Sequence, residues 1–326
     1  MMESEESTMT GSKFAIPVLC LISLLLSACT LDLKKEDGST DEEAIIEETL
    51  YSCPENYVYV PSPAGSPPPG FCVAKYEMKD VGSVATSQAG GAPWGAIDRD
   101  DAAAACQALG ADFDLISNAQ WNQVARNLGS VSTNWNSGAV TSGALNRGHF
   151  NDDFGYLLAA GGDDHPCYGL DLDQDSNPDS LASLDAVCSP TLWHENRRTH
   201  QLSTGKVLWD FAGNAWEWTK DDYAGGAAAS NVYISELITL ADSFTTLFAP
   251  AASVLCADPN LNDFCGMGFA WINGPGGAVA RGGSLYNGTQ TGIFSIDLDN
   301  SASYTANHLG FRCVSAATPI LPSASN

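Results

Sequence analysis

Eight cysteines after residue 50 constrain the fold of this chain more than any other feature. They are Cys53, Cys72, Cys106, Cys167, Cys188, Cys256, Cys265 and Cys313. An even number of cysteines in an exported protein indicates a framework of disulfide bonds. No two of them form a C-x-x-C pair, so the sequence does not indicate a zinc ribbon or a thioredoxin-like redox motif.

The spacing of these cysteines favours three local disulfides and one long-range disulfide. The local pairs are Cys53–Cys72, Cys167–Cys188 and Cys256–Cys265, which leaves Cys106 with Cys313. Spacing alone does not fix the connectivity, because eight cysteines allow about 105 pairings. A bridge that closes a loop of roughly 200 residues would stabilise the fold by at most about 5 kcal/mol.

The N-terminus predicts export. Residues 14–28 form an apolar run of 15 residues, shorter than the roughly 20 that span a bilayer, which is typical of a signal-peptide core. The run ends in Leu26–Cys29, and small residues before a cysteine resemble the lipobox of bacterial lipoproteins. We therefore expect a signal peptide over 1–28 and a lipid anchor on Cys29 in a bacterial cell envelope. A secretory signal with a chance cysteine is the alternative.

Thr30 follows the lipobox cysteine where some lipoproteins have Asp, and this favours the outer membrane by analogy. Residues 29–50 are rich in charged residues and contain no aromatic residue, so we expect a solvated acidic tether. Residues 317–326 read as a flexible tail. The globular domain is thus expected over 51–316.

The charge of the chain excludes one class of partner. There are 39 acidic residues and 14 basic ones, a formal net charge of −25. Nucleic-acid binding depends on Lys and Arg contacts to phosphates, so we expect no nucleic-acid partner. Strong acidity is typical of soluble proteins and of some calcium-binding proteins.

The pattern of the domain predicts an α+β fold with long loops. Alternation over 57–61 and 71–78 predicts a hairpin fastened by Cys53 and Cys72. Helices are expected over 99–110, with Ala104 and residues 106–109 toward the core, and within 114–129, capped by Ser117 or Asn118. Further strands are expected in the two stretches 206–221, which the turn Gly213-Asn214 interrupts, and 308–314.

Five segments in a fixed order resemble one known family. They are PW, DAAAACQALGADFDLISNAQWNQVA, GNAWEW, ARGGS and LGFRCV, within about residues 55–315. In this order they resemble the domain of formylglycine-generating enzymes, also called sulfatase-modifying factors. The run Arg197–Asp210 is similar to bacterial lipoproteins that carry this domain. The resemblance implies a variant C-type-lectin-like fold, in which a disulfide such as Cys106–Cys313 commonly joins the first helix to the last strand.

The resemblance also implies a calcium site. Members of the family use the Asn and Glu of GNAWEW as ligands, which here are Asn214 and Glu217. Oxygen ligands on a tight turn suit calcium; a turn-capping Asn and a solvated Glu are the alternative. The stretch Asp171–Asp179 lacks the Gly and Glu of an EF-hand loop, so it is a solvated acidic insert or a loose calcium site.

The catalytic cysteines of the family are missing here. The enzymes need two cysteines after GGS, whose thiolates bind copper(I). At that spacing this chain has Asn287 and Gly292. We therefore expect no copper and a non-catalytic domain. The alternatives are a diverged enzyme of the same family, in which Ser284 matches the active-site serine, and a purely structural envelope protein.

The loops after the GGS motif are the expected ligand face. Adaptable polar groups with tyrosines are typical of recognition surfaces, although such residues also simply form loops. The expected ligand-binding residues are Ser284, Tyr286, Asn287, Thr289, Asn300, Tyr304 and Asn307. We expect a glycan, a peptide or an envelope protein as partner.

Two further groups of residues have structural explanations. Trp209, Trp216 and Trp218 alternate as core residues do, although one of them could stack on a sugar. His194 and His200 are six residues apart, which does not match the H-E-x-x-H zinc motif, so we expect this segment at the surface.

Overall fold

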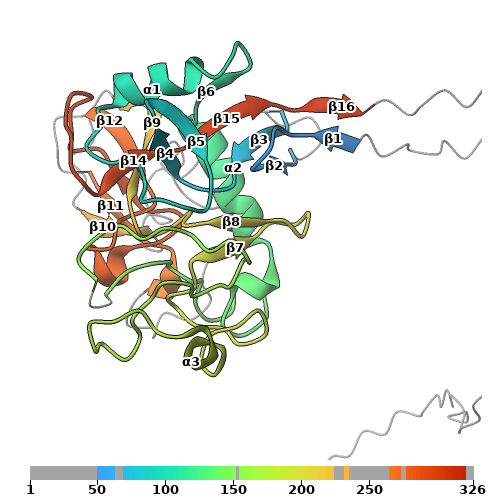
Figure 1. Ribbon diagram of the computed structural model, residues 1–326, viewed down its shortest axis with the longest axis vertical. Coiled ribbons are helices and arrows are strands. Elements are labelled where there is room, and N and C mark those ends of the chain that lie inside the picture. Colours follow the sequence, from blue (N-terminus) through green and yellow to red (C-terminus); the bar gives the residue numbers. More distant parts are fainter. Residues whose placement is uncertain are drawn as a thin grey trace, which may run out of the picture. The chain divides into compact units, whose positions relative to one another are not determined.

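The computed structural model describes residues 50–62, 69–151, 154–223, 231–234, 264–272 and 277–320 (Figure 1). The predicted signal peptide, Cys29, nearly all of the predicted tether, and Cys256 lie outside the described residues. Within the described part of the chain, no helix has both the length and the apolar character of a membrane span.

The predicted α+β class is confirmed. The helices are α1 (Arg99–Gln107), α2 (Asn118–Gly129) and α3 (Leu181–Asp185), with short 3-10 turns at Ser132–Asn134, Phe264–Gly266 and Gly288–Gln290. The strands are β1 (Leu50–Ser52), β2 (Tyr57–Val60), β3 (Phe71–Ala74), β4 (Met78–Val81), β5 (Val84–Ser87), β6 (Phe113–Leu115), β7 (Thr199–Gln201), β8 (Val207–Trp209), β9 (Trp216–Tyr223), β10 (Val232–Tyr233), β11 (Phe269–Trp271), β12 (Gly277–Arg281), β13 (Ile296–Asp297), β14 (Leu309–Phe311), β15 (Cys313–Ala316) and β16 (Thr318–Ile320).

Two sheets form the framework. A six-stranded sheet has the order β10-β11-β13-β12-β9-β14, and a four-stranded sheet has the order β2-β3-β15-β6. Two pairs in the larger sheet are parallel, β11 with β13 and β14 with β9. The three remaining sheets are the two-stranded pairs β4-β5, β7-β8 and β1-β16, the last of which projects from the body in Figure 1.

The disulfide framework agrees with the prediction wherever the structure describes it. The bridges Cys53–Cys72, Cys106–Cys313 and Cys167–Cys188 are present. The first fastens β3 to the chain just before β2, and the two strands form the predicted hairpin. Cys265 is also in a disulfide, but its predicted partner Cys256 lies outside the described residues.

Both early helices form because their first turns are capped. The Asp98 carboxylate accepts a hydrogen bond from the Asp101 amide at the start of α1. Ser117 and Gln120 form a reciprocal capping box at the start of α2. The expected core face of α1 is right for Cys106, which is buried, and for Leu109, which packs against the core, but wrong for Ala104, which is exposed. Ala102, one turn before Cys106, is the other buried residue.

The predicted strand over 308–314 is two strands. β14 ends at Phe311 and joins the six-stranded sheet, whereas β15 starts at Cys313 and joins the four-stranded sheet. Arg312 therefore lies at the change from one sheet to the other. Beyond it, residues 318–320 of the predicted tail form β16 and pair with β1.

The larger sheet separates two apolar clusters. Alternate residues of β12 face opposite sides, so Val279 belongs to one cluster and Ala278 and Ala280 belong to the other. The first cluster contains the stacked rings of Trp121 and Phe211. The second contains the Cys106–Cys313 bridge, which joins α1 to β15 of the four-stranded sheet.

Removing the long-range disulfide should cost more stability than removing a local one. The Cys106–Cys313 bridge spans 207 residues and the Cys53–Cys72 bridge spans 19. From loop closure alone, replacing each pair by alanine should lower the free energy of unfolding by about 5 and about 3 kcal/mol respectively. Urea unfolding of both double variants measures this. Equal losses would contradict a role for Cys106–Cys313 in restricting the unfolded chain.

Candidate functional site

The turn before β9 is fixed by the backbone and by one buried amide. Gly213 and Asn214 both have left-handed backbone angles, with φ of 75° and 57°. A β-carbon on Gly213 would lie 2.6 Å from the His149 carbonyl oxygen, so the position requires glycine. The Asn214 amide donates to the Glu77 carboxylate at 2.6 Å, and its oxygen accepts from the Leu158 amide at 2.9 Å.

Glu217 is paired with a buried arginine. The Arg312 guanidinium donates from Nη2 and Nε to the two carboxylate oxygens of Glu217, at 2.7 and 3.0 Å. Both side chains are fully buried. The same guanidinium donates to the carbonyl oxygens of Ala74 in β3 and Trp209 in β8. One cation therefore neutralises Glu217 and connects β9 to two other strands.

The residues predicted to bind calcium do not fit such a site in this geometry. The oxygen of Asn214 is already bonded to Leu158 N and lies 2.9 Å from Nδ1 of His149. Both oxygens of Glu217 face the Arg312 cation, which would repel a metal ion. The side chains satisfy each other without a metal, and the calcium prediction for this pair gains no support here.

The buried charges around this turn perturb one another. Burial raises the pKa of Glu77 to about 8, with a further contribution from the neighbouring Asp210. Burial likewise lowers the pKa of Lys79. A second buried pair joins Arg198 to Asp210 at 2.7 Å. Glu77, Lys79, Arg198 and Asp210 are all buried, so these charges interact with one another inside the protein.

A pocket of about 190 Å³ opens against the six-stranded sheet, with lining residues from β9, β11, β12, β13 and β14. It is lined by Trp216, Trp271, Ala280, Asn287, Asp297, Asn300, Tyr304, His308 and Leu309. The register of the sheet brings several of these together: Trp271 and Ala280 both lie opposite Asp297, and Trp216 lies opposite Leu309. The rings of Trp216 and Trp271 meet edge to face, with centroids 5.2 Å apart.

The loop that forms the outer wall is held to the body. It runs from β13 to β14 and carries Asn300, Tyr304 and His308. The carbonyl oxygens of Ala302 and Ala306 accept from the backbone amides at positions 99 and 96, where α1 begins. At the other end, a β-carbon at Gly277 would collide with the Asn300 carbonyl oxygen, so glycine allows the close approach.

Three of the seven predicted ligand-binding residues line this pocket: Asn287, Asn300 and Tyr304. Ser284 is buried beneath them, and its hydroxyl and backbone amide both donate to the Asn287 side-chain oxygen. Tyr286 donates from its hydroxyl to the Gly155 carbonyl, and its ring packs edge to face on His308. Ser284 and Tyr286 therefore do not line the pocket themselves but contact Asn287 and His308, which do.

The other two predicted residues lie elsewhere. Thr289 lines a second, polar pocket of about 370 Å³ together with Asp171 and Glu195. Asn307 is exposed and does not line either pocket. The prediction missed Trp271, which is the last residue of β11, and His308, which directly precedes β14. An isolated Phe-Ala-Trp stretch over 269–271 was the only signal for Trp271.

Of the three tryptophans near GNAWEW, only Trp216 reaches a pocket. Trp209 and Trp218 are fully buried, as core packing predicts. The surface prediction for 193–200 is wrong for His200, which is fully buried and bonds to the Asn146 carbonyl oxygen through Nε2. Burial lowers its pKa to about 4.

The acidic stretch 171–179 folds on itself. Asp171, Asp173 and Asp179 bring carboxylate oxygens within 4.8 Å of one another. The buried Asp171 carboxylate accepts from the amides of Asp175 and Ser176. Acidic turns of this kind are common without a bound ion.

A model of the sulfatase-modifying factor enzyme 1-like domain matches residues 43–317. This chain belongs to that family. Among solved structures it is similar to Treponema denticola variable protein 1, with 14% sequence identity, a TM-score of 0.33, and coverage of 76% of this chain and 85% of that chain. No curated protein sequence matches it.

The pocket contains the position of the first catalytic cysteine that the family resemblance implies, where this chain has Asn287. The second implied position is Gly292, which is buried, and a β-carbon there would press on the backbone of Met267 and Gly268. This backbone leaves no room for a thiol at 292. All the cysteines that the structure describes are in disulfides.

Replacing Arg312 by methionine should strongly destabilise the protein. The change leaves the buried Glu217 carboxylate without its cation, which costs about 3–5 kcal/mol in the free energy of unfolding. The matched control is Lys220→Met, which breaks an exposed pair with Asp114 and should cost at most about 1 kcal/mol.

The loss of unfolding free energy caused by Arg312→Met should become smaller as the pH falls. Burial raises the pKa of Glu217 in the folded protein, and removing Arg312 raises it further. Protonation then removes the uncompensated charge in the folded state. Chemical denaturation at pH 7.5 and 5.0 measures both effects. A loss as small as that of Lys220→Met would contradict the role assigned to Arg312.

Proposed function

We propose that this protein is a lipid-anchored bacterial cell-envelope protein whose sulfatase-modifying-factor domain is a non-catalytic binding module. Its site is the pocket between Trp216, Trp271 and the loop that carries Asn300 and Tyr304. The observation that carries the proposal is the composition of this pocket. It combines aromatic faces with several polar groups, as ligand sites do, at the position where the family's catalytic chemistry would require thiolates.

The two tryptophans of the pocket, Trp216 and Trp271, have indole N–H groups that make no hydrogen bond to the described residues. Five others donate their indole N–H groups inside the protein: Trp121, Trp135, Trp193, Trp209 and Trp218. Those of Trp216 and Trp271 have no acceptor among the described residues. Neither N–H group is among the buried polar groups that lack a partner, so both are accessible and could donate to a bound glycan, peptide or protein.

The absence of thiols supports a binding role over catalysis. The chain has no cysteine between Cys265 and Cys313, and the described cysteines are all oxidised to disulfides. Copper(I) prefers thiolate ligands. The groups that line the pocket are amides, aromatic rings, one carboxylate and one imidazole, which suit recognition of a polar ligand.

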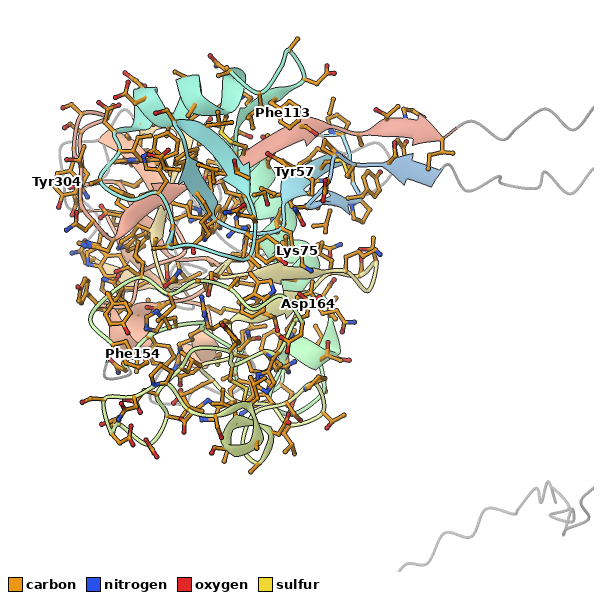
Figure 2. All side chains as sticks on the ribbon, in the orientation of Figure 1. Tyr57, Lys75, Phe113, Phe154, Asp164 and Tyr304 are labelled. Carbon is orange, nitrogen blue, oxygen red and sulfur yellow. A yellow bond between two sulfur atoms is a disulfide. The ribbon has the colours of Figure 1, made fainter. Side chains whose placement is uncertain are left out.

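The position of the pocket suits a protein displayed from a membrane. The predicted tether joins the domain at β1, which projects from one side of the body. Tyr304, at the mouth of the pocket, lies at the opposite side in Figure 2. A lipid on Cys29 would hold the domain by the β1 side and leave the pocket open to ligands.

Binding through the pocket should depend on Tyr304. Its side chain is 42% exposed, so Tyr304→Ala should remove ligand contact without unfolding the protein. Loss of an aromatic anchor of this kind weakens binding by about tenfold or more. Glycan and peptide arrays identify a ligand, and titration of the wild type and Tyr304→Ala measures the change. Tyr156→Ala, at an exposed tyrosine outside the pocket, should bind as the wild type does.

Two results would contradict this proposal. One is that every array ligand binds Tyr304→Ala and the wild type equally. The other is chemical conversion of the bound ligand during the titration, detected by mass spectrometry, which would favour a diverged enzyme.

The anchor makes a separate prediction. In a bacterial host, Cys29→Ala should abolish lipidation and leave the precursor unprocessed, with its apolar signal segment still attached. Globomycin, which inhibits the lipoprotein signal peptidase, should reproduce the unprocessed form of the wild type. Radiolabelled palmitate and membrane fractionation measure the outcome. Normal processing in the presence of globomycin would show that the signal is an ordinary secretory one.

A further inference from the structure

This inference rests on the proposed function and specifies the ligand. We infer that the pocket at Trp216 and Trp271 binds a positively charged organic ammonium group, such as the side chain of a lysine in a peptide. The inference depends on the carboxylate of Asp297, the aromatic walls and the absence of Lys and Arg from the lining.

Asp297 is the one carboxylate among the residues that line the pocket, and neither Lys nor Arg is among them. Its Oδ1 accepts from the Asp299 amide at 2.8 Å, and its Oδ2 accepts from the Asn300 side-chain amide at 2.9 Å. Both donors are neutral. The carboxylate is thus fixed in direction by two hydrogen bonds while its charge is left without a counter-ion among the described ion pairs.

Two fully buried carboxylates of this protein have a cationic partner, whereas the buried Asp171 and Glu77 accept hydrogen bonds from amides. Asp210 is paired with Arg198 and Glu217 with Arg312, each at 2.7 Å. Carboxylates removed from water normally have such a partner, because burial alone penalises the charge. Asp297 lies partly buried in a pocket that is open to ligands, so a cation that enters the pocket would provide the missing partner.

The walls of the pocket favour an organic cation over an anion. The π-faces of Trp216, Trp271 and Tyr304 carry negative electrostatic potential, which attracts ammonium groups and repels carboxylates. Burial lowers the pKa of the nearby His308, which keeps its imidazole neutral at pH 7.5. A volume of about 190 Å³ accommodates a methylene chain with a terminal ammonium, and excludes an extended sugar chain.

The acidity of Asp297 gives the binding a pH dependence. Burial raises its pKa to about 6, and the neighbouring Asp299 carboxylate contributes in the same direction. Affinity for an ammonium group should be full at pH 7.5 and should fall as the pH drops through about 6, because the carboxylate becomes neutral. Protonation of His308 acts in the same direction.

The test uses two probes that differ only at the end of the side chain: Nα-acetyl-lysine methylamide and its norleucine analogue, which has a hydrogen atom in place of the ammonium group. Binding to the disulfide-intact protein is followed by tryptophan fluorescence and by calorimetry at pH 7.5. The lysine probe should bind about tenfold more tightly than the norleucine probe. Asp297→Asn should abolish this preference, because the amide oxygen still accepts the Asp299 hydrogen bond but carries no charge.

The matched control is Asp299→Asn. Asp299 is exposed on the same turn, and its substitution changes the net charge by the same amount. The lysine preference should survive in this variant, which separates a local contact from the general attraction of an acidic protein for cations. If Asp297→Asn fails to fold, the wild-type titration at pH 7.5 and 5.0 decides: the lysine preference should decrease severalfold at pH 5.0.

Equal affinity for the two probes would overturn the inference, and so would an equal effect of Asp297→Asn and Asp299→Asn. Array ligands that require Tyr304 but show no preference for lysine would overturn the ammonium ligand while leaving the binding module intact. Array ligands that are all insensitive to Tyr304→Ala would overturn both.

Discussion

The guanidinium of Arg312 connects parts of the chain that lie far apart in the sequence. It neutralises Glu217 on β9 and donates to carbonyl oxygens of Ala74 and Trp209. It is also the residue between β14 and β15, where the chain passes from one sheet to the other. The planar fork of arginine satisfies several acceptors in one plane, which lysine cannot do. The Gly213-Asn214 turn and the pocket beyond it depend on the resulting alignment of β9 and β14.

The sequence was most informative where local chemistry decides the structure. Helix capping at Ser117, the turn at Gly213-Asn214 and the local cysteine pairs all follow from residues close together in the chain. It was least informative for His200, whose burial depends on a bond to Asn146 that no periodicity signals. The division of 308–314 into two strands was also not predicted. It depends on pairing with strands that are distant in the sequence.

The pocket also depends on long-range contacts that the sequence pattern does not signal. The loop composition predicted Asn287, Asn300 and Tyr304, but the aromatic wall is completed by Trp271, which comes from a separate strand. Its place beside Asp297 follows from the parallel pairing of β11 with β13. The chain belongs to the family and has no cysteine between Cys265 and Cys313. At Gly292, where the resemblance implies a second cysteine, the backbone leaves no space for a cysteine side chain.

The pairing of β1 with β16 and the Cys53–Cys72 bridge also determine how the domain responds to mechanical force. A pull at residue 50 would strip the three-residue strand β1 from β16 and then reach Cys53. From there the covalent bridge passes the load to Cys72 in β3, bypassing β2. β3 is paired with β15, and Cys313 in β15 is bonded to α1. Tension would therefore be carried into the centre of the domain by two disulfides and one strand pair.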